Sequence, residues 1–187
     1  MWLLAGLGNF GENYAKTRHN AGFMALEAIS QKHNLQNIGK KFHSIVCKGN
    51  IAGENVIGIY PQTFMNKSGL AVIDAANFYK IPPQNIIAIH DDLDLDTGRL
   101  KVKLGGGNGG HNGLKDIDRV IGNNYWRLRI GINRPTHSSA VSSYVLQPFT
   151  TDEQITIDSS CDFIANNIHL LLSEKEQLFM NNFALIP

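Results

Sequence analysis

Short apolar runs that stop at glycine or charged residues alternate along this chain with stretches in which apolar residues recur at helical spacing. Residues 2–8 and 86–90 have the length and composition of buried strands. Helical spacing follows at 20–33, at 68–79 and in a long C-terminal segment from about Asp152. Because strands must pair and apolar helix faces must be covered, this alternation favours an α/β fold.

Helices do not join all of the expected strands. Residues 44–49 and 55–60 flank a short turn and predict a hairpin, whereas residues 99–104 and 126–132 alternate basic with apolar side chains. Strands joined partly by helices and partly by hairpins predict a mixed sheet. We therefore expect one globular α/β domain over residues 1–187, a twisted mixed β-sheet with helices on both faces.

The composition fits a globular protein, because 43% of the 187 residues are hydrophobic and 18% are charged. No apolar run approaches the roughly 20 residues of a membrane helix. The first residues lack the basic leader and the long apolar core of a signal peptide, so we expect a cytoplasmic protein. Cys47 and Cys161 have no Cys or His at metal-ligand spacing, which disfavours a disulfide framework and a zinc site.

The net charge of +1 conceals a strong asymmetry along the chain. Residues 97–135 hold eight basic and two acidic side chains, a net charge of +6, which leaves −5 for the rest. The alternation at 99–104 predicts that Arg99, Lys101 and Lys103 share one strand face. Such a stripe fits either a solvated surface or the footprint of a polyanion. The glycine-rich segment that follows it, with a helix N-terminus beyond, favours a phosphate nearby.

Hydrolysis near neutral pH needs a general base, and two of the seven histidines have a sequence context that suits one. His19 lies at a predicted loop-to-helix junction, and His90 precedes Asp91 at the end of a buried strand. Because strand ends meet at one edge of a sheet, His19 and Asp91 can form a pair in which the carboxylate fixes the imidazole tautomer. On spacing alone, a structural histidine at a helix N-terminus remains an open alternative for His19.

Three other chemistries are disfavoured by the sequence. Residues 6–11 match G-x-G-x-x-G, but no amphipathic helix follows directly and no acidic residue ends a second strand about 20 residues on, which disfavours a dinucleotide. No G-x-S-x-G elbow supplies a nucleophile, so His19 would have to activate water. The acidic residues from Asp91 to Asp96, with His90, match no calcium or zinc spacing, so we predict neither a metal nor another cofactor.

Asparagines are dense at the expected loop positions. Each one fits turn chemistry, Asn20 also suits a helix N-cap, and either Asn112 or Gly113 is expected to open a helix. A neutral amide offers an acceptor and two donors, so it can bind peptide groups whatever side chains they carry. A site that must accept many peptides would use such residues. The asparagines concerned are Asn9, Asn20, Asn66, Asn108 and Asn112.

Taken together, five segments of the chain resemble the bacterial-type peptidyl-tRNA hydrolase family, and the similarity runs along nearly the whole sequence. That resemblance implies a monomeric cytoplasmic enzyme, needing no metal, that hydrolyses the ester between a peptide and the 3′ ribose of tRNA. The partner it implies is peptidyl-tRNA, bound through the acceptor end and the peptide backbone, with no DNA and no membrane. The segments are GLGNFGENYAKTRHNAGF from Gly6, PQTFMNKSG from Pro61, HDDLDLDTGRLKVKLGGGNGGHNGLKDI from His90, RLRIGINRP from Arg127 and SYVLQPF from Ser143.

The resemblance also implies roles for individual residues. His19 would be the base that activates water, Asp91 would orient it, and Asn9 would line the catalytic site. Two further groups are implied: Tyr14, Met65, Asn66 and Asn112 around the substrate, and Lys101, Lys103 and Arg129 at the tRNA phosphates, where Lys103 and Arg129 would clamp the 5′-terminal phosphate.

The sequence departs from the family pattern at two positions, where Phe10 replaces the usual proline and Asn133 the common glycine. Neither residue supplies a reacting group, so the departures bear on loop geometry. A catalytically silent RNA-binding relative would keep the basic stripe without turnover. An amidohydrolase of free peptides would have no use for that stripe. A test for release of peptide from an N-acyl-aminoacyl-tRNA would distinguish the three possibilities: the hydrolase, the silent RNA-binding relative and the amidohydrolase.

Overall fold

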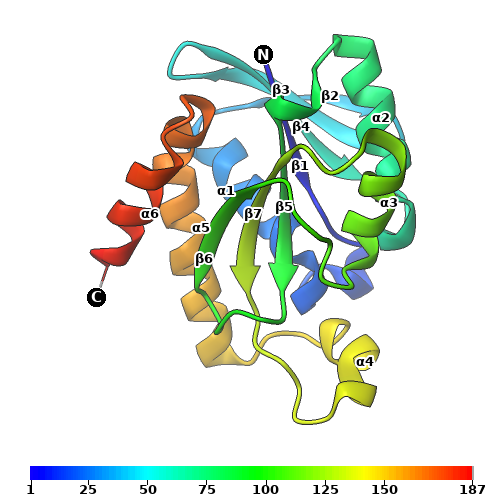
Figure 1. The fold of residues 1–187 in the computed structure, drawn as a ribbon, viewed down its shortest axis with the longest axis vertical. Helices are drawn as coiled ribbons and strands as arrows, with labels where there is room; N and C mark the ends of the chain where they lie inside the picture. Colours follow the sequence, from blue (N-terminus) through cyan, green and yellow to red (C-terminus); the bar gives the residue numbers. More distant parts are fainter. Residues whose placement is uncertain (187) are drawn as a thin grey trace.

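Within residues 1–186, which a computed structural model describes, seven strands form one twisted sheet in the order β2-β3-β4-β1-β5-β7-β6 (Figure 1). The central strands β4, β1, β5 and β7 run parallel, while β2, β3 and β6 are antiparallel to their neighbours. The strands are β1 (Trp2–Gly6), β2 (Gln36–Lys41), β3 (Ser44–Ile51), β4 (Glu54–Pro61), β5 (Ile86–Asp92), β6 (Leu100–Leu104) and β7 (Trp126–Gly131).

Helices cover both faces of the sheet (Figure 1). One layer contains α1 (Ala21–Lys32), α5 (Thr151–Leu172) and α6 (Glu176–Ala184), and the other contains α2 (Ser68–Tyr79) and α3 (Asn112–Ile121). A short helix, α4 (Val141–Val145), lies beyond the C-terminal ends of the parallel strands. The sheet separates two apolar cores, and successive residues of β1 alternate between them, as Leu3 and Leu4 do. The predicted fold class, an α/β domain with a mixed sheet between helices, is confirmed.

One strand and two helices, β2, α4 and α6, were not expected from the sequence. Strand β2 is an edge strand that pairs only with β3, and nearly all of its side chains are exposed, so it carries no apolar run. The expected C-terminal helix ends at Leu172, and α6 begins at Glu176 after a short break. Thr150, which precedes the expected start, caps α5 and forms a capping box with Glu153.

The predicted basic stripe is correct for two of its three residues. Lys101 and Lys103 lie on the face of β6 opposite Leu100, which belongs to the core beneath α5 and α6. Arg99 lies before the strand, and its guanidinium stands over the ring of Phe183 on α6, 5.7 Å from the ring centroid. The expectation for Arg99 was therefore wrong, because the regular alternation begins only at Leu100.

No helix in residues 1–186 has the length and apolar character needed to cross a membrane.

The start of α1 approaches the ends of β1 and β5 at backbone contact distance. A Cβ atom placed on Gly22 would lie 2.1 Å from the Ile89 carbonyl oxygen and 2.6 Å from the Leu7 nitrogen. Only glycine fits at that position. Because α1 directly follows the 3-10 helix η2 (Arg18–Asn20), this contact sets the position of His19 at the edge of the sheet.

We expect Gly22→Ala to lower the free energy of unfolding by at least the roughly 1–3 kcal/mol typical of overpacking, or to prevent folding. The clashing atoms belong to the backbone and cannot rotate away. Urea unfolding followed by circular dichroism measures the change. Gly107→Ala is the control, because a Cβ there would meet nothing within 4 Å. Equal stability of the two variants would contradict this account of the packing.

Candidate active site

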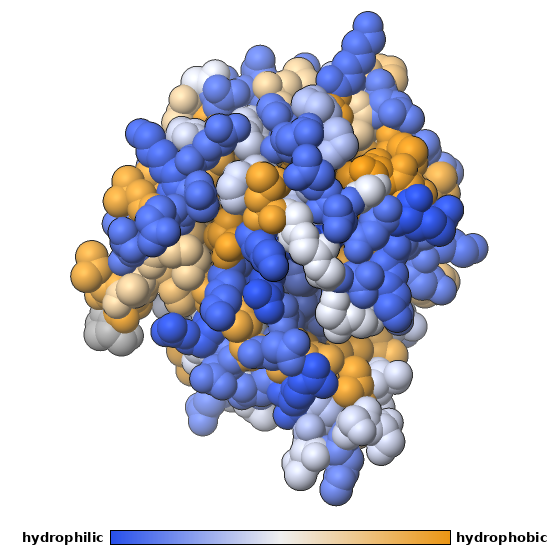
Figure 2. All heavy atoms as spheres, viewed as in Figure 1, coloured by the Kyte–Doolittle hydropathy of each residue, from blue (hydrophilic) through white to orange (hydrophobic). Residues whose placement is uncertain are grey.

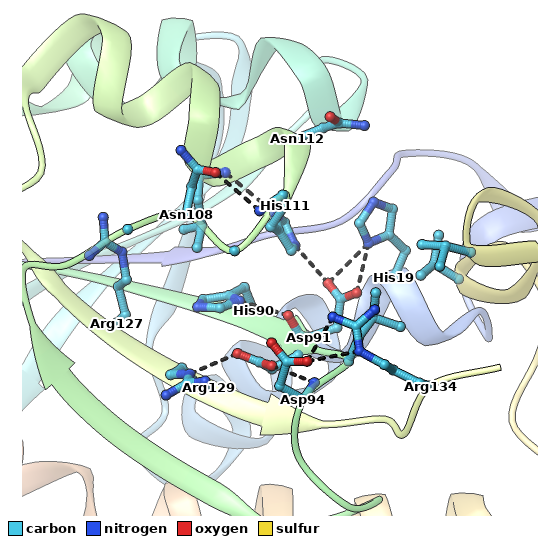
Figure 3. Close-up of a pocket in the computed structure, with 18 of the residues that line it drawn as sticks. His19, His90, Asp91, Asp94, Asn108, His111, Asn112, Arg127, Arg129 and Arg134 are labelled. Atoms are coloured by element: carbon cyan, nitrogen blue, oxygen red, sulfur yellow. Dashed lines mark hydrogen bonds and ion pairs between the residues drawn. The ribbon is translucent and has the colours of Figure 1, made fainter. Parts of the chain in front are cut away.

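A cleft of about 350 Å³ opens at the C-terminal ends of β5 and β7, where open α/β sheets usually build their sites. His19, Asp91 and His111 line one part of it, and Lys103 and Arg129 line another. Figure 2 shows strongly hydrophilic side chains gathered around a hollow on this face of the molecule. The labelled residues in Figure 3 come from η2, from β5 and the turn after it, from the glycine-rich loop and the start of α3, and from β7 and the loop after it.

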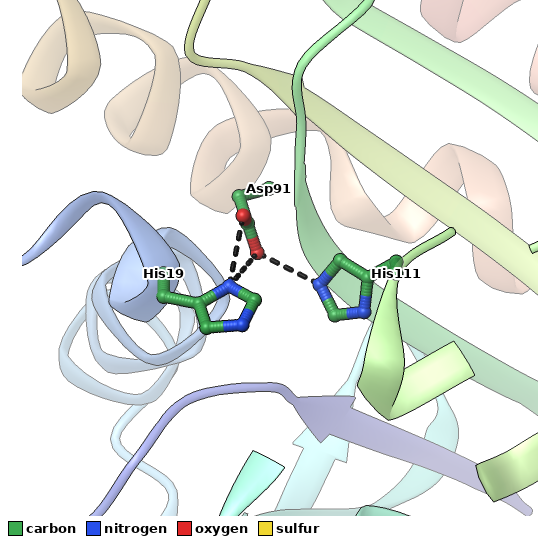
Figure 4. Close-up of side chains that lie close together, drawn as sticks. All are labelled: His19, Asp91 and His111. Atoms are coloured by element: carbon green, nitrogen blue, oxygen red, sulfur yellow. Dashed lines mark hydrogen bonds and ion pairs between the residues drawn. The ribbon is translucent and has the colours of Figure 1, made fainter. Parts of the chain in front are cut away.

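The predicted pair of His19 and Asp91 is present. Nδ1 of His19 lies 3.0 Å from Oδ1 and 2.9 Å from Oδ2 of Asp91, and both residues are buried (Figure 4). Because the carboxylate accepts a hydrogen bond from Nδ1–H, the other ring nitrogen, Nε2, keeps its lone pair. This is the tautomer that a general base requires.

His111 is the member of this group that the sequence analysis missed. Its Nε2 lies 2.8 Å from Oδ1 of Asp91, and its Nδ1 accepts hydrogen bonds from the backbone nitrogens of Gly113 (3.1 Å) and Leu114 (3.3 Å). His111 is therefore the N-cap of α3, and Nε2 must carry the proton that it donates to Asp91. The available signal was its place just before Asn112, but histidine is not among the usual N-cap residues.

The charges of this group follow from its contacts. Burial alone would raise the pKa of Asp91, but His19 and His111 outweigh it and hold that pKa well below its usual range. Burial would lower the pKa of His19, but the Asp91 charge and hydrogen bond outweigh it, so the pKa lies above 6.5. His19 is thus neutral, and able to accept a proton, only above that raised value.

His90 does not serve as the base. Burial and the neighbouring His111 lower its pKa to about 3, so its ring is neutral. Nδ1 of His90 donates to the Asp91 carbonyl oxygen at 2.7 Å, and its Nε2 is buried without a hydrogen-bond partner among the described residues. Its neutral ring packs edge-on against His111, with the centroids 5.0 Å apart.

Asn9 and Asn20 connect the loop after β1 to the turn that carries His19. The amide of Asn20 bonds both backbone groups of Asn9, with Oδ1 accepting from N and Nδ2 donating to O, each at 2.9 Å. Oδ1 of Asn9 in turn accepts from the Met65 nitrogen at 2.8 Å. Asn20 does occupy the N-cap position of α1, but its side chain makes no capping hydrogen bond, because Asn9 engages it.

The residues expected around the substrate lie at different depths. Asn112 is exposed and lines the cleft, while Met65 is buried beneath α3, where a Cβ on Gly113 would lie 2.6 Å from its sulfur. Asn66 is exposed on the 3-10 helix η3 (Met65–Lys67), and Tyr14 is half-buried in η1 (Glu12–Tyr14). Of the residues expected around the substrate, Asn112 alone lines this cleft, and Asn9, which was expected to line the catalytic site, does not line it either.

The basic residues form a two-strand array on β6 and β7. Lys101 pairs in register with Arg129, and Lys103 pairs with Arg127. Nε of Arg129 donates to Oδ2 of Asp92 at 2.7 Å. Lys103 and Arg129 line the cleft, whereas Lys101 is exposed outside it.

A buried arginine, Arg18, also holds the turn that carries His19. Arg18 donates to Oε2 of Glu153 at 2.9 Å, and its guanidinium lies 4.1 Å from the centroid of the Tyr144 ring. Its backbone nitrogen also donates to the carbonyl oxygen of Gln147. The segment after α4 and the start of α5 therefore position the turn that carries His19.

His19, Asp91 and His111 could also be read as three metal ligands, since one possible ligand atom of each lies within 4.8 Å of the others. The hydrogen bonds favour a different reading. Nδ1 of His111 accepts from two backbone N–H groups, so Nε2 carries a proton and has no lone pair for a metal. The group has the pattern of one carboxylate held by two imidazole N–H donors.

An α/β fold whose sheet edge holds a histidine hydrogen-bonded to a buried carboxylate, in a cleft that also contains lysine and arginine side chains, is an arrangement typical of a hydrolase. The chain belongs to the peptidyl-tRNA hydrolase family, whose model, described as Peptidyl-tRNA hydrolase, matches residues 3–186.

Several relatives have the same description. A peptidyl-tRNA hydrolase of Xanthobacter autotrophicus is 48% identical over 181 residues, which is 97% of this chain and 90% of that relative. One of Rickettsia africae is 48% identical over 185 residues, or 98% of this chain and 100% of the relative. The crystal structure of peptidyl-tRNA hydrolase from Acinetobacter baumannii superposes with a TM-score of 0.92 at 42% identity, covering 97% of this chain and 93% of that one.

We expect the pKa of His19, measured by NMR titration of its ring, to lie above 6.5 in the wild type and below 6.5 in Asp91→Asn. The substitution removes the charge that raises this pKa, while burial continues to lower it. Asp92→Asn is the matched control, because Asp92 pairs with Arg129 and not with His19. An unchanged value in Asp91→Asn would contradict the assigned electrostatics.

Proposed function

We propose that this chain hydrolyses the ester that joins a peptide to the 3′ ribose of tRNA, with His19 as the general base. One observation carries the proposal: the Nδ1 atom of His19 is held by Asp91 in a cleft that also contains Lys103 and Arg129. A base and a phosphate-binding surface in the same cleft fit an ester on a nucleic acid.

The reaction needs one proton to move twice. Nε2 of His19 takes a proton from water as the water oxygen attacks the ester carbonyl carbon. The tetrahedral intermediate then collapses, the bond to the ribose 3′ oxygen breaks, and that oxygen takes the proton back from His19. The products are tRNA with a free 3′ hydroxyl and the peptide carboxylic acid, which releases the second proton of the water to solvent and becomes the carboxylate. Asp91 orients the ring and stabilises the imidazolium between the two steps.

His111 supports Asp91 in this scheme. The carboxylate must stay ionised to stabilise the imidazolium, and two imidazole N–H groups stabilise its charge. The contact also ties the start of α3, and with it Asn112, to the catalytic pair. His111 is accordingly a positioning residue that acts through Asp91.

The peptide side of the site is assigned to Asn9, Asn66, Asn112, Met65 and Tyr14. Because Oδ1 of Asn9 already accepts from the backbone of Met65, the donor Nδ2 is the part of Asn9 that serves the substrate. Asn112 and Asn66 have exposed amides that suit peptide groups. Met65, which is buried, and Tyr14, which is half-buried, are assigned a role in shaping the site.

The tRNA side is assigned to Lys101, Lys103 and Arg129, whose charges follow the two strands away from the catalytic pair. Non-specific attraction of phosphates supports binding of any tRNA. A monomeric state, a cytoplasmic location and the absence of DNA or membrane partners belong to the same proposal. A catalytically silent RNA-binding relative would share this surface, and the presence of the His19–Asp91 pair disfavours it.

We expect His19→Ala to slow peptide release from N-acyl-aminoacyl-tRNA by roughly 10²–10⁴-fold, the usual contribution of a general base. tRNA binding should be unchanged and the protein should still fold, with a lower unfolding midpoint because the buried Asp91 carboxylate loses one of its two imidazole donors. His137→Ala, an exposed histidine outside the cleft, is the control and should keep the wild-type rate. No release by the wild type would favour the silent alternative, and full activity in His19→Ala would exclude this base.

We expect Lys101→Gln and Lys103→Gln each to weaken tRNA binding and to reduce the slope of log K against log salt by somewhat under one unit. Arg129→Gln should have a smaller effect, because Asp92 already pairs with Arg129. Titrations at four or five salt concentrations measure the slopes. Lys48→Gln, on the remote strand β3, is the control. If all four variants behaved alike, the assignment of this surface to tRNA would be wrong.

A further inference from the structure

Phe10 and Phe64 form a pair of exposed aromatic rings beside the candidate site. Their ring centroids lie 5.1 Å apart at an interplanar angle of 40°, and 37% of Phe10 and 53% of Phe64 remain exposed. Neither ring belongs to the two apolar cores that the sheet separates. Contact between the rings leaves much of their surface open to solvent, so a ligand with an apolar side chain would gain free energy by covering them.

Hydrogen bonds hold the backbone next to both rings. Phe10 follows Asn9, whose backbone nitrogen and oxygen are both bonded by the side-chain amide of Asn20. Phe64 precedes Met65, whose nitrogen donates to Oδ1 of Asn9 at 2.8 Å. The ring pair is therefore attached to the turn that carries the catalytic base. Because aromatic side chains have few rotatable bonds and this backbone is fixed, covering the rings costs little conformational entropy.

The order of the strands puts the ring pair and the tRNA surface on opposite sides of Asp91. The sheet runs β4-β1-β5-β7-β6, and Asp91 lies near the end of β5, the middle strand of these five (Figure 1). The segments after β1 and β4 carry Phe10 and Phe64, whereas β6 and β7 carry the basic residues assigned to tRNA. The ester carbonyl joins the ribose oxygen on one side and the peptide on the other. With the ribose toward the basic strands, the peptide extends toward the rings.

We propose that Phe10 and Phe64 form an apolar subsite for a side chain of the peptide, and this inference rests on the proposed function. An extended chain spans about 3.3–3.6 Å per residue, so the last three residues of the peptide cover roughly the first 10 Å from the ester. The occupant is the side chain of one of these three residues. The amides of the site bind peptide groups whatever side chains they carry, and the two rings add a preference for a large apolar side chain.

The test uses a set of N-acetyl-tripeptidyl-tRNAs that share one tRNA. The reference peptide is triglycine, and leucine replaces glycine at one position at a time. Glutamine at the same positions supplies a polar side chain in place of the apolar one. The quantity compared is kcat/KM of peptide release for each peptide, divided by kcat/KM for triglycine. This ratio isolates the side-chain preference from any general change in activity.

The protein variants are Phe10→Ala and Phe64→Ala, which each remove one ring from the pair. The matched control is Phe78→Ala, because Phe78 is 65% exposed and its ring centroid lies 5.0 Å from that of Phe42, in a separate aromatic group. All three rings are exposed, so the variants should fold, and circular dichroism with thermal unfolding checks this.

We expect leucine at one of the three positions to raise kcat/KM of the wild type about tenfold over triglycine, the lower end of the discrimination that apolar pockets achieve. Glutamine at that position should give a much smaller gain. Phe10→Ala and Phe64→Ala should each remove most of the leucine gain, and Phe78→Ala should retain it. A leucine ratio near one at all three positions in the wild type would overturn the subsite.

Two other results would also overturn it. If Phe10→Ala and Phe64→Ala slow release of the leucine peptide and of triglycine by the same factor, the rings support the fold or stack on the terminal adenine of the tRNA, and they do not select the peptide. Loss of the leucine gain in Phe78→Ala as well would show that the preference does not arise at this ring pair. No release of any peptide by the wild type would overturn the proposed function itself.

Discussion

The carboxylate of Asp91, buried between two imidazole rings, is the interaction on which the rest of the site depends. An isolated buried carboxylate is strongly disfavoured, and the N–H groups of His19 and His111 compensate for its lost hydration. The same contacts assign the protons: Nδ1 of His19 is protonated, Nε2 is free, and His111 is the donor on the opposite side. Three segments that are distant in the sequence are thereby joined at one point, and the chemistry of the base follows from that junction.

That junction is possible only because the backbone around it is packed closely. Gly22 lets α1 begin against the ends of β1 and β5, and the paired amides of Asn9 and Asn20 hold the loop after β1 against the His19 turn. The η3 turn is attached through the Met65 nitrogen. The hydrogen bonds of Asn9 and Asn20 satisfy backbone groups that would otherwise be buried without partners. The site is therefore supported by regular elements and short turns, and this favours a preorganised base.

The segment that lines the cleft has a high formal positive charge, but carboxylates pair with most of its arginines in the structure. Arg127, Arg129 and Arg134 are each paired with a carboxylate, whereas Lys103 has no such partner among the described residues. Pairing fixes the guanidinium groups and reduces their long-range attraction, so the formal charge of the segment overstates the field that a polyanion meets. What the paired arginines retain is directed N–H donors, as in Arg127, whose buried Nε and Nη1 have no hydrogen-bond partner among the described residues. Recognition of phosphate in this cleft thus depends on geometry as well as on net charge.

Local patterns in the sequence were enough to predict six of the seven strands, most helices and the candidates His19 and Asp91, because periodicity and strand-end polarity are properties of short segments. Edge strand β2 was not predicted, because an exposed strand that pairs on one side only needs no apolar run. The contacts of His111, Asn20 and Arg127 were decided only by the tertiary structure. Their partners lie 10 or more residues away, or become partners through cross-strand register, and the order of strands in the sheet determines those contacts. Residue spacing along the chain does not determine the order of the strands in the sheet. The contacts of these residues therefore could not be predicted from the sequence.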